Sequence, residues 1–277
     1  MSALSAQQIA WLVESAETQA WMNYYACAPL EFALEHRVGA RRIGSAWVTM
    51  IPGGGSWFFN RINGLGLDGL ATEQALDEAI GFLTSAGCKE YTVQLSPAAR
   101  PPELENWLKA RGMRVRSNWA KMYRGHEPSS SVHTDLRLEP IGMELADVFG
   151  RTLLETFEMP GALLPMMSCH VGKPGWTNYL GFDGRVPVAT ASMFISGEVA
   201  WLGMGSTRAT NRGRGAQSAM FARRIEDGRK AGCKWFVTET GEDTPAAPNP
   251  SYRNMLRAGF QLAYMRPNYV YAAAVID

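Results

Sequence analysis

The chain has 277 residues, of which 46% are hydrophobic and 19% are charged, which is ordinary for a globular protein. This length suggests two domains. A formal net charge of +1 gives no basic surface of the kind that binds nucleic acid, and no apolar run approaches the roughly 18 residues of a membrane span. We therefore expect neither nucleic acid nor membrane as a partner. The first residues lack a cationic start followed by an apolar run, so we expect no signal peptide and a cytoplasmic protein.

Cysteine and histidine are too scattered to predict a metal site. The four cysteines lie far apart without a CxxC pair, and we interpret them as core thiols in a reducing compartment: Cys27, Cys88, Cys169 and Cys233. His170 follows Cys169 directly, but neighbouring side chains on a helix or strand point in different directions. We expect no bound metal.

In the first half of the chain, residues 5–36 are rich in helix-forming residues, and Ser5 and Gln8 have the spacing of a capping box. Apolar residues then recur at helical spacing from Leu76 to Leu83, and Gly87 suits the end of that helix. The segment "EYTVQL" predicts a strand. A proline-rich loop, a short helix and a last strand follow it.

The polar stretch 124–134 carries a proline and three serines, and we predict that it links two domains, residues 1–126 and 133–277. Beyond it, "DLRLEPI" predicts a strand and "MELADVFGRTLLETF" an amphipathic helix. The segment 177–195 predicts a hairpin around Asp183 and Gly184, and "VAWLGMGST" another strand. Helices alternate with strands that include an antiparallel hairpin, which indicates an α/β or α+β fold.

The sequence contains an internal repeat. "AGCK" occurs at 86–89 and again at 231–234, which is 231 − 86 = 145 residues later. Each copy follows a predicted helix. Each precedes a strand, a proline-rich loop, a short helix ending at a glycine, and an aromatic-rich segment. A duplicated module is the simplest interpretation.

The two copies differ at the start of the helix before "AGCK". The second copy has "NRGRGAQ" at 211–217, where the first has "GLDGLAT" at 66–72. A helix N-terminus presents unpaired N–H groups and partial positive charge. Gly213 and Gly215 allow close approach, while Arg212 and Arg214 add charge. The second copy therefore has the features of a phosphate site, although a solvated glycine-rich turn is the plain alternative.

"NRGRGAQSAM" after a strand, followed by "NPSYRNMLRAGF", resembles the acyl-CoA-binding core of the GNAT superfamily of N-acetyltransferases. The family pattern is Arg/Gln-x-x-Gly-x-Gly/Ala, and Gln217 departs from it at the last position. The resemblance covers about 133–277. It implies two tandem GNAT-like domains, each a mixed, mostly antiparallel sheet flanked by helices, with a degenerate first copy spanning residues 40–124.

The resemblance also implies a site. The pantetheine arm of acetyl-CoA, the cosubstrate, would meet the backbone of Ser206 and Thr207, and Asn249 would face the cosubstrate from the last helix. The N–H groups of six residues would hold the pyrophosphate: Arg212, Gly213, Arg214, Gly215, Ala216 and Gln217. The acceptor would be a primary amine of a small molecule or peptide. Acceptor identity, acyl length and oligomeric state are left open, with a homodimer among the alternatives.

The catalytic residues are less well defined. Aligning the copies on "AGCK" pairs Glu239 with Gln94, so a titratable group occurs only in the copy with the phosphate loop. We therefore predict Glu239 as the general base, against the alternative of a carboxylate paired with an arginine. Glu155, Glu158 and Glu242 are weaker candidates.

The proton donor is also uncertain. The position that often carries the family's acidic tyrosine holds Met255 here, while Tyr252 lies one turn earlier and Tyr264 and Tyr269 fall in the closing strands. Tyr252 is the candidate acid, with packing as its alternative.

Two sequence features suggest other functions, a dinucleotide site and an acyl-CoA sensor. "GLGLDG" at 64–69 fits GxGxxG, but the acidic residue that a dinucleotide site needs at the end of the next strand is absent, since Glu90 begins that strand. A non-catalytic acyl-CoA sensor would keep the phosphate loop without the acidic tyrosine, and turnover with a panel of amines separates it from an enzyme.

Overall fold

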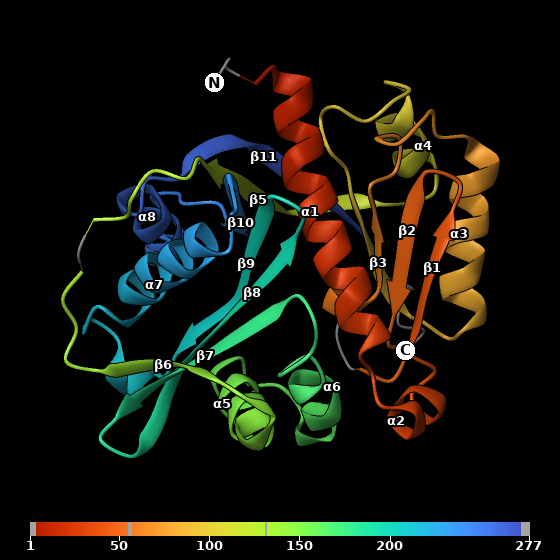
Figure 1. Cartoon of the computed structure of the whole chain (residues 1–277). Helices are drawn as coiled ribbons and strands as arrows, with labels where there is room; N and C mark the ends of the chain where they lie inside the picture. The colour runs from red at the N-terminus through yellow and green to blue at the C-terminus, as the bar shows by residue number, and fades with distance from the viewer. Residues whose placement is uncertain (1–3, 55–56, 131, 273–277) are drawn as a thin grey trace. The chain divides into compact units, whose positions relative to one another are not determined.

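The computed structural model describes residues 4–54, 57–130 and 132–272. Two compact units result (Figure 1). Unit 1 contains residues 4–26, 30–120 and 263–272 of these ranges, and unit 2 contains residues 27–29 and 121–262. The units differ from the predicted domain limits: residues 27–29 and 121–126 belong to unit 2, and the last segment, from Ala263 on, belongs to unit 1. Ser131 of the predicted linker lies outside the described residues.

Unit 1 is a mixed sheet with helices. Its helices are α1 (Ala6–Ala26), α2 (Leu30–Glu35), η1 (Trp57–Phe59), α3 (Glu73–Ser85) and α4 (Leu104–Ala110). Its strands are β1 (Gly39–Ile43), β2 (Ala46–Met50), β3 (Arg61–Asn63), β4 (Glu90–Gln94), most of β5 (Arg114–Arg124) and the end of β11 (Gln261–Ala272). The order β1-β2-β3-β4-β11 is antiparallel except for the parallel β3/β4 pair. The chain's last strand thus completes the first unit's sheet.

Helices α1 and α3 of unit 1 have the capping interactions that their sequences favour. The Ser5 amide donates to Gln8 Oε1 at 2.8 Å, and the Gln8 amide donates to Ser5 Oγ at 3.2 Å, which confirms the capping box. Thr72 caps α3 by accepting from the Ala75 amide at 3.1 Å. The helix ends just before Gly87, whose φ of +92° is the left-handed conformation that favours glycine.

The sheet of unit 1 has one apolar and one polar face. Alternate residues of β2 and β4, such as Val48 and Val93, pack with Leu76 and Leu83 of α3 in the unit's main core. The opposite face of β2, β3 and β4 carries five buried polar residues: Thr49, Arg61, Asn63, Thr92 and Gln94. Such a face must satisfy its polar groups internally.

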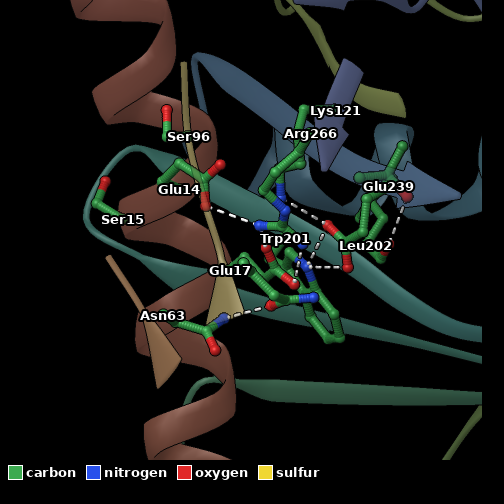
Figure 2. Close-up of polar contacts among 12 residues, drawn as sticks. Glu14, Ser15, Glu17, Asn63, Ser96, Lys121, Trp201, Leu202, Glu239 and Arg266 are labelled. Carbon is green, nitrogen blue, oxygen red and sulfur yellow. Dashed lines mark hydrogen bonds and ion pairs between the residues drawn. The ribbon is translucent and has the colours of Figure 1, made fainter. Parts of the chain in front are cut away.

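Buried charges from α1 and β11 meet in unit 1 (Figure 2). Arg266 Nη1 lies 2.7 Å from Glu14 Oε2 and 2.5 Å from Glu17 Oε2, and all three side chains are at most 1% exposed. Arg61 Nη1 lies 3.6 Å from Glu17 Oε1. The Tyr264 hydroxyl donates to Glu14 at 2.7 Å, and burial holds the pKa of this tyrosine well above its usual value. The carboxylates are thus balanced by buried guanidinium groups.

Unit 2 contains the second copy of the repeat. Its helices are η2 (Met143–Leu145), α5 (Ala146–Thr156), η3 (Gly161–Leu163), α6 (Leu164–Ser168), η4 (Ala209–Asn211), α7 (Ala216–Lys230) and α8 (Pro250–Arg257). Its strands are β6 (Arg137–Ile141), β7 (Trp176–Asp183), β8 (Val186–Ser196), β9 (Val199–Thr207) and β10 (Trp235–Gly241), and the end of β5 adjoins β10. The order β5-β10-β9-β8-β7-β6 has antiparallel pairs from β9 to β6 and a parallel β9/β10 pair.

The predicted hairpin of unit 2 is confirmed. Strands β7 and β8 pair from Trp176 opposite Phe194 to Asp183 opposite Val186, and Gly184 turns with a φ of +60° (Figure 1). The helix predicted after β6 is present as η2 and α5. Within the described ranges, no helix is long and apolar enough to cross a membrane, and no group of His, Cys, Asp and Glu has a metal-binding arrangement.

Candidate functional site

Strands β9 and β10 of unit 2 pair only at their beginnings. The parallel register joins Trp235–Val237 to Val199–Trp201, and the Thr238 hydroxyl donates to the Leu202 carbonyl at 2.7 Å one step further on. Both strands then continue, β9 to Thr207 and β10 to Gly241. Beyond this point β9 still pairs with β8, but its backbone groups on the β10 side are available to a ligand.

A β-bulge lies in β9 where the pairing with β10 ends. The β8/β9 register shifts between Thr190 opposite Ser206 and Ser192 opposite Gly203, which leaves an extra residue in β9. Met204 has a φ of +51° there, and its carbonyl accepts from Thr190 Oγ1 at 2.9 Å. The bulge re-aims the backbone of Gly205 to Thr207.

A buried arginine supports this bulge from α7. Arg224 Nη1 donates to the Ser192 carbonyl at 3.0 Å and to the Gly203 carbonyl at 3.3 Å, so it ties the helix to both strands. Burial lowers the pKa of Arg224 to about 10, which leaves the guanidinium protonated at neutral pH. Sequence reasoning did not single out Arg224.

The glycine loop leads directly into α7. Gly213 and Gly215 have φ values of +81° and +80°, and Gly215 is the residue before the first turn of the helix. A Cβ added to Gly215 would lie 2.6 Å from the His133 carbonyl oxygen, so only glycine fits this position. The first N–H groups of α7 have no partner within the helix, and they open toward the end of β9.

Arg214 does not supply charge for a ligand as the sequence suggested. Its guanidinium donates to Asp183 Oδ2 at 2.5 Å and to Asp135 Oδ2 at 2.5 Å. The same guanidinium holds the pKa of both carboxyls below the usual value. The Arg214 carbonyl also accepts from Thr134 Oγ1 at 2.8 Å. We call Arg214, Asp135 and Asp183 the loop clamp, because together they fasten the glycine loop to the rest of unit 2.

A cavity of about 640 Å³ lies where the bulge, the glycine loop and α8 meet. It is lined by seven of the nine residues predicted for cosubstrate binding: Ser206, Thr207, Arg212, Gly213, Gly215, Ala216 and Gln217. Arg214 and Asn249 are the two that are not among its lining residues. Thr156 and Phe157 also line it, as do Asn254 and Arg257, which the sequence did not single out. Arg212 and Arg257 therefore bring the positive charge to this cavity.

Helix α8 is fixed to the glycine loop by side-chain hydrogen bonds. Gln217 Nε2 donates to Ser251 Oγ at 3.0 Å, and Asn254 donates to Gln217 Oε1. A small residue at position 217 could not make these bonds. Asn249 caps α8 by accepting from the Ser251 amide at 3.0 Å, and its Nδ2 donates to the Gly241 carbonyl at 2.6 Å. Asn249 thus holds α8 against the end of β10.

Comparison with known proteins finds solved structures that are similar in fold rather than in sequence. No protein-family model matches the chain, and no curated protein matches it. Among solved structures, a GCN5-related N-acetyltransferase from Kribbella flavida has a TM-score of 0.63 at 15% identity, over 94% of this chain and 95% of that chain. One from Sphaerobacter thermophilus has a TM-score of 0.60 at 13% identity, over 82% and 76%. A tandem GNAT protein from the clavulanic acid biosynthesis pathway has a TM-score of 0.60 at 14% identity, over 99% and 98%.

The chain has the GNAT fold, in two tandem units. Within this fold, unit 2 carries the open cavity, and unit 1 is closed at the corresponding place. In unit 1, β3 and β4 stay paired through Asn63 opposite Gln94, and Asn63 Nδ2 donates to Gln94 Oε1 at 2.7 Å. The Arg100 amide donates to the Gly66 carbonyl at 2.9 Å, and the Ala71 amide donates to the Arg100 carbonyl at 2.9 Å. The loop after β4 therefore covers the degenerate glycine loop.

Glu239, the predicted base, is a buried ion-pair partner in the GNAT fold of unit 2. Its Oε2 lies 3.2 Å from Lys121 Nζ, and the Trp201 indole N–H donates to both carboxylate oxygens at 3.1 and 3.2 Å (Figure 2). The Glu239 side chain is 7% exposed and that of Lys121 is fully buried. Glu239 is not among the lining residues of the 640 Å³ cavity. This geometry resembles the structural alternative, with lysine in place of the expected arginine.

The other predicted catalytic groups are not among the residues that line the cavity either. Tyr252 follows the α8 cap and is not among the cavity's lining residues, whereas Met255, in the usual position of the tyrosine, is buried. Glu155 pairs with Arg208 at 2.6 Å. Tyr264 and Tyr269 belong to unit 1. The polar side chains that line the cavity beside the bulge are Thr156 and Ser206, whose hydroxyls are 2.7 Å apart.

Proposed function

We propose that the chain is an N-acetyltransferase that transfers the acetyl group of acetyl-CoA to a primary amine of a small molecule or peptide. The observation that carries the proposal is the cavity of unit 2, which joins a bulged strand end, unpaired on its β10 side, to a glycine loop at a helix N-terminus. Its volume of about 640 Å³ is large enough for much of an acetyl-CoA molecule. Solved structures of this fold bear the name N-acetyltransferase.

The residues present fit acetyl-CoA. The N–H groups at the start of α7, together with Arg212 and Arg257, offer hydrogen bonds and positive charge to the pyrophosphate. The left-handed Gly213 and Gly215 keep side chains out of its way. The backbone from Gly205 to Thr207 offers extended hydrogen bonding to the pantetheine arm, as one strand does to another.

When bound, acetyl-CoA supplies a thioester: the amine nitrogen bonds to its carbonyl carbon, the C–S bond breaks, and the thiolate takes up a proton as the amine releases one. The chain's contribution is to orient the reactants and to polarise the carbonyl through backbone N–H groups at the bulge. The Thr156 and Ser206 hydroxyls line the same place. No carboxylate lies among the cavity's described lining residues, so we propose that water receives the amine proton.

The proposal is tested by following release of free thiol from acetyl-CoA in the presence of a panel of primary amines. We expect release above background with at least one amine, and mass spectrometry should find that amine heavier by one acetyl group. A protein that binds acetyl-CoA but releases no thiol with any amine would contradict the proposal.

Loosening the loop clamp should weaken acetyl-CoA binding. Arg214→Ala removes the guanidinium that holds both Asp135 and Asp183, so the glycine loop is less ordered in the free protein. Ordering the loop when acetyl-CoA binds then makes the binding free energy less favourable. We expect the Kd for acetyl-CoA, measured by calorimetry, to rise by about tenfold. Arg214→Lys should recover part of the affinity, since lysine cannot span two carboxylates as a fork. Lys230→Ala, at the far end of α7, is the control. An unchanged Kd in Arg214→Ala would show that the clamp does not position the loop.

Glu239 should matter for stability more than for turnover. Glu239→Gln removes the negative charge 3.2 Å from the buried Lys121 ammonium, and we expect the free energy of unfolding to fall by about 3 kcal/mol in urea denaturation. A general base contributes roughly 10²–10⁴-fold to the rate. We expect no loss of that size in kcat at a temperature where the variant is folded. Such a loss, with the acidic limb of the kcat–pH profile shifted, would restore Glu239 as the base.

The alternative is a non-catalytic acyl-CoA sensor. Two observations favour it: Glu239 is held in a buried ion pair, and Met255 stands where the family often has its acidic tyrosine. The sensor predicts the same binding of acetyl-CoA and no acetylated amine. The thiol-release experiment therefore separates the two functions directly.

A further inference from the structure

Unit 1 has a cavity of its own, of about 220 Å³, which the proposed acyl transfer does not use. It lies between α1, the turn from β1 to β2, and the loop that follows β3. Its volume equals that of about seven molecules of liquid water, which suits a small molecule. The cavity is not a second copy of the acetyl-CoA site, because its lining residues do not include the start of α3.

The lining combines indole rings with hydroxyl and charged groups. Trp11 and Trp47 supply the rings, and Trp11 is 46% exposed, which is unusual for so large an apolar side chain. Thr18 adds a hydroxyl group. Glu14 also lines the cavity, but both of its carboxylate oxygens are held on the other side, by Tyr264 and Arg266. The charge available to a ligand is therefore carried by Asp68 and Arg42.

The contacts of Arg42 indicate which kind of ligand this cavity binds. Its guanidinium carbon lies 5.3 Å from the centroid of the Trp47 ring, and its Nη2 donates to Asp68 Oδ2 at 2.5 Å. An aromatic face together with a carboxylate is the usual receptor for an organic cation. The chain's own guanidinium thus occupies a cation site in this cavity.

The internal cation is easy to exchange. The side chains of Arg42 and Asp68 are 45% and 52% exposed, and an ion pair so exposed to water contributes little to stability. The other hydrogen bond of Arg42, from Nε to the Gly44 carbonyl at 3.2 Å, is exposed as well. Arg42 can therefore exchange both contacts for bonds to water and leave Asp68 and the indoles to an external cation. The exposed Trp11 ring would then cover the ligand's alkyl chain.

We propose that this cavity binds a small organic cation, a primary ammonium or guanidinium on a short alkyl chain, with Asp68 as its counter-ion and Trp11 and Trp47 as its apolar walls. The proposal is independent of acyl transfer, because it concerns unit 1 alone and needs no acetyl-CoA. It gives the degenerate copy a binding function that its lost phosphate loop does not predict.

The test is a ligand-observed NMR titration of the full chain with n-butylammonium at neutral pH, without acetyl-CoA. n-Butanol and butyrate serve as the neutral and anionic counterparts of equal chain length. We expect n-butylammonium to bind and its two counterparts to bind at least about tenfold more weakly. Preferential binding of butyrate would overturn the proposal and make Arg42 the ligand-binding group of an anion site.

Three variants locate the bound cation. Asp68→Asn should weaken n-butylammonium binding by at least about tenfold, and Trp11→Ala should weaken it less. Arg42→Gln removes the internal competitor and should tighten binding. All three positions are exposed, so the fold should persist, and circular dichroism will check it. Unchanged affinity in Asp68→Asn would place the cation elsewhere, for example at the amine-acceptor site of unit 2, and would overturn the proposal while leaving the proposed function standing.

Discussion

Gly215→Asp should abolish the binding of acetyl-CoA. The backbone of Gly215 has a φ of +80°, and a Cβ there would meet the His133 carbonyl oxygen at 2.6 Å, so the loop must move to accept any side chain. The new carboxylate would also lie where we propose that the pyrophosphate binds. A ligand present at 100 times its Kd stabilises a protein by about 2.7 kcal/mol. We expect acetyl-CoA to raise the thermal midpoint of the wild type and to leave that of Gly215→Asp unchanged.

Two further variants separate loss of binding from loss of structure. Gly232 has a φ of +90° and ends the same helix away from the cavity, with open space around a Cβ, so Gly232→Asp should cost some stability but keep the response to acetyl-CoA. Ser218→Asp places a carboxylate in the first turn of α7, where it stabilises the helix but opposes an anionic ligand. If Ser218→Asp and Gly215→Asp both respond to acetyl-CoA as the wild type does, the glycine loop is not the phosphate site.

Arg266→Met should destabilise unit 1 more than any surface change. It leaves the carboxylates of Glu14 and Glu17 buried without the guanidinium that lies between them. Breaking a buried pair in this way costs about 3–5 kcal/mol, and here two carboxylates lose one partner. At roughly 2–4 °C for each kcal/mol, the thermal midpoint should fall by about 10 °C or more. Differential scanning calorimetry measures it.

The matched control is Arg253→Met in unit 2, which breaks the ion pair with Asp243. The Arg253 side chain is 53% exposed, and a pair so exposed to water contributes little to stability. A compensated variant, Glu14→Gln with Arg266→Met, removes one carboxylate together with the guanidinium and leaves Glu17 with Arg61, so it should recover part of the stability lost in the single variant. If Arg266→Met melts within about 2 °C of the wild type, the buried network is not what holds α1.

The features that were predicted from the sequence are local ones. The capping box at Ser5, the hairpin at Gly184 and the helix before Cys233 each depend on residues a few positions apart. The internal repeat added a comparison of two copies, which drew attention to the glycine loop. The structure places seven of the nine predicted cosubstrate-binding residues around one cavity because β9, the loop and α7 are consecutive in the chain.

The features that the sequence did not reveal depend on distant partners. Lys121 reaches Glu239 from 118 positions away, and Arg266 reaches Glu14 from 252 positions away, so no spacing indicates either pair. Glutamates three apart on a helix normally indicate a solvated face rather than buried ligands of an arginine. The partners of Arg214 are distant as well: Asp135 precedes β6 and Asp183 ends β7, so the sequence alone suggested a phosphate ligand.

Calorimetric titration of acetyl-CoA into the wild-type chain tests the central claim most directly. Unit 2 has an open cavity at the glycine loop, whereas in unit 1 the Asn63–Gln94 bond and the Arg100 backbone bonds close the corresponding place. We predict one binding site per chain. Two sites would show that the first copy is not degenerate, and no binding at all would contradict the acetyltransferase proposal and leave only the fold.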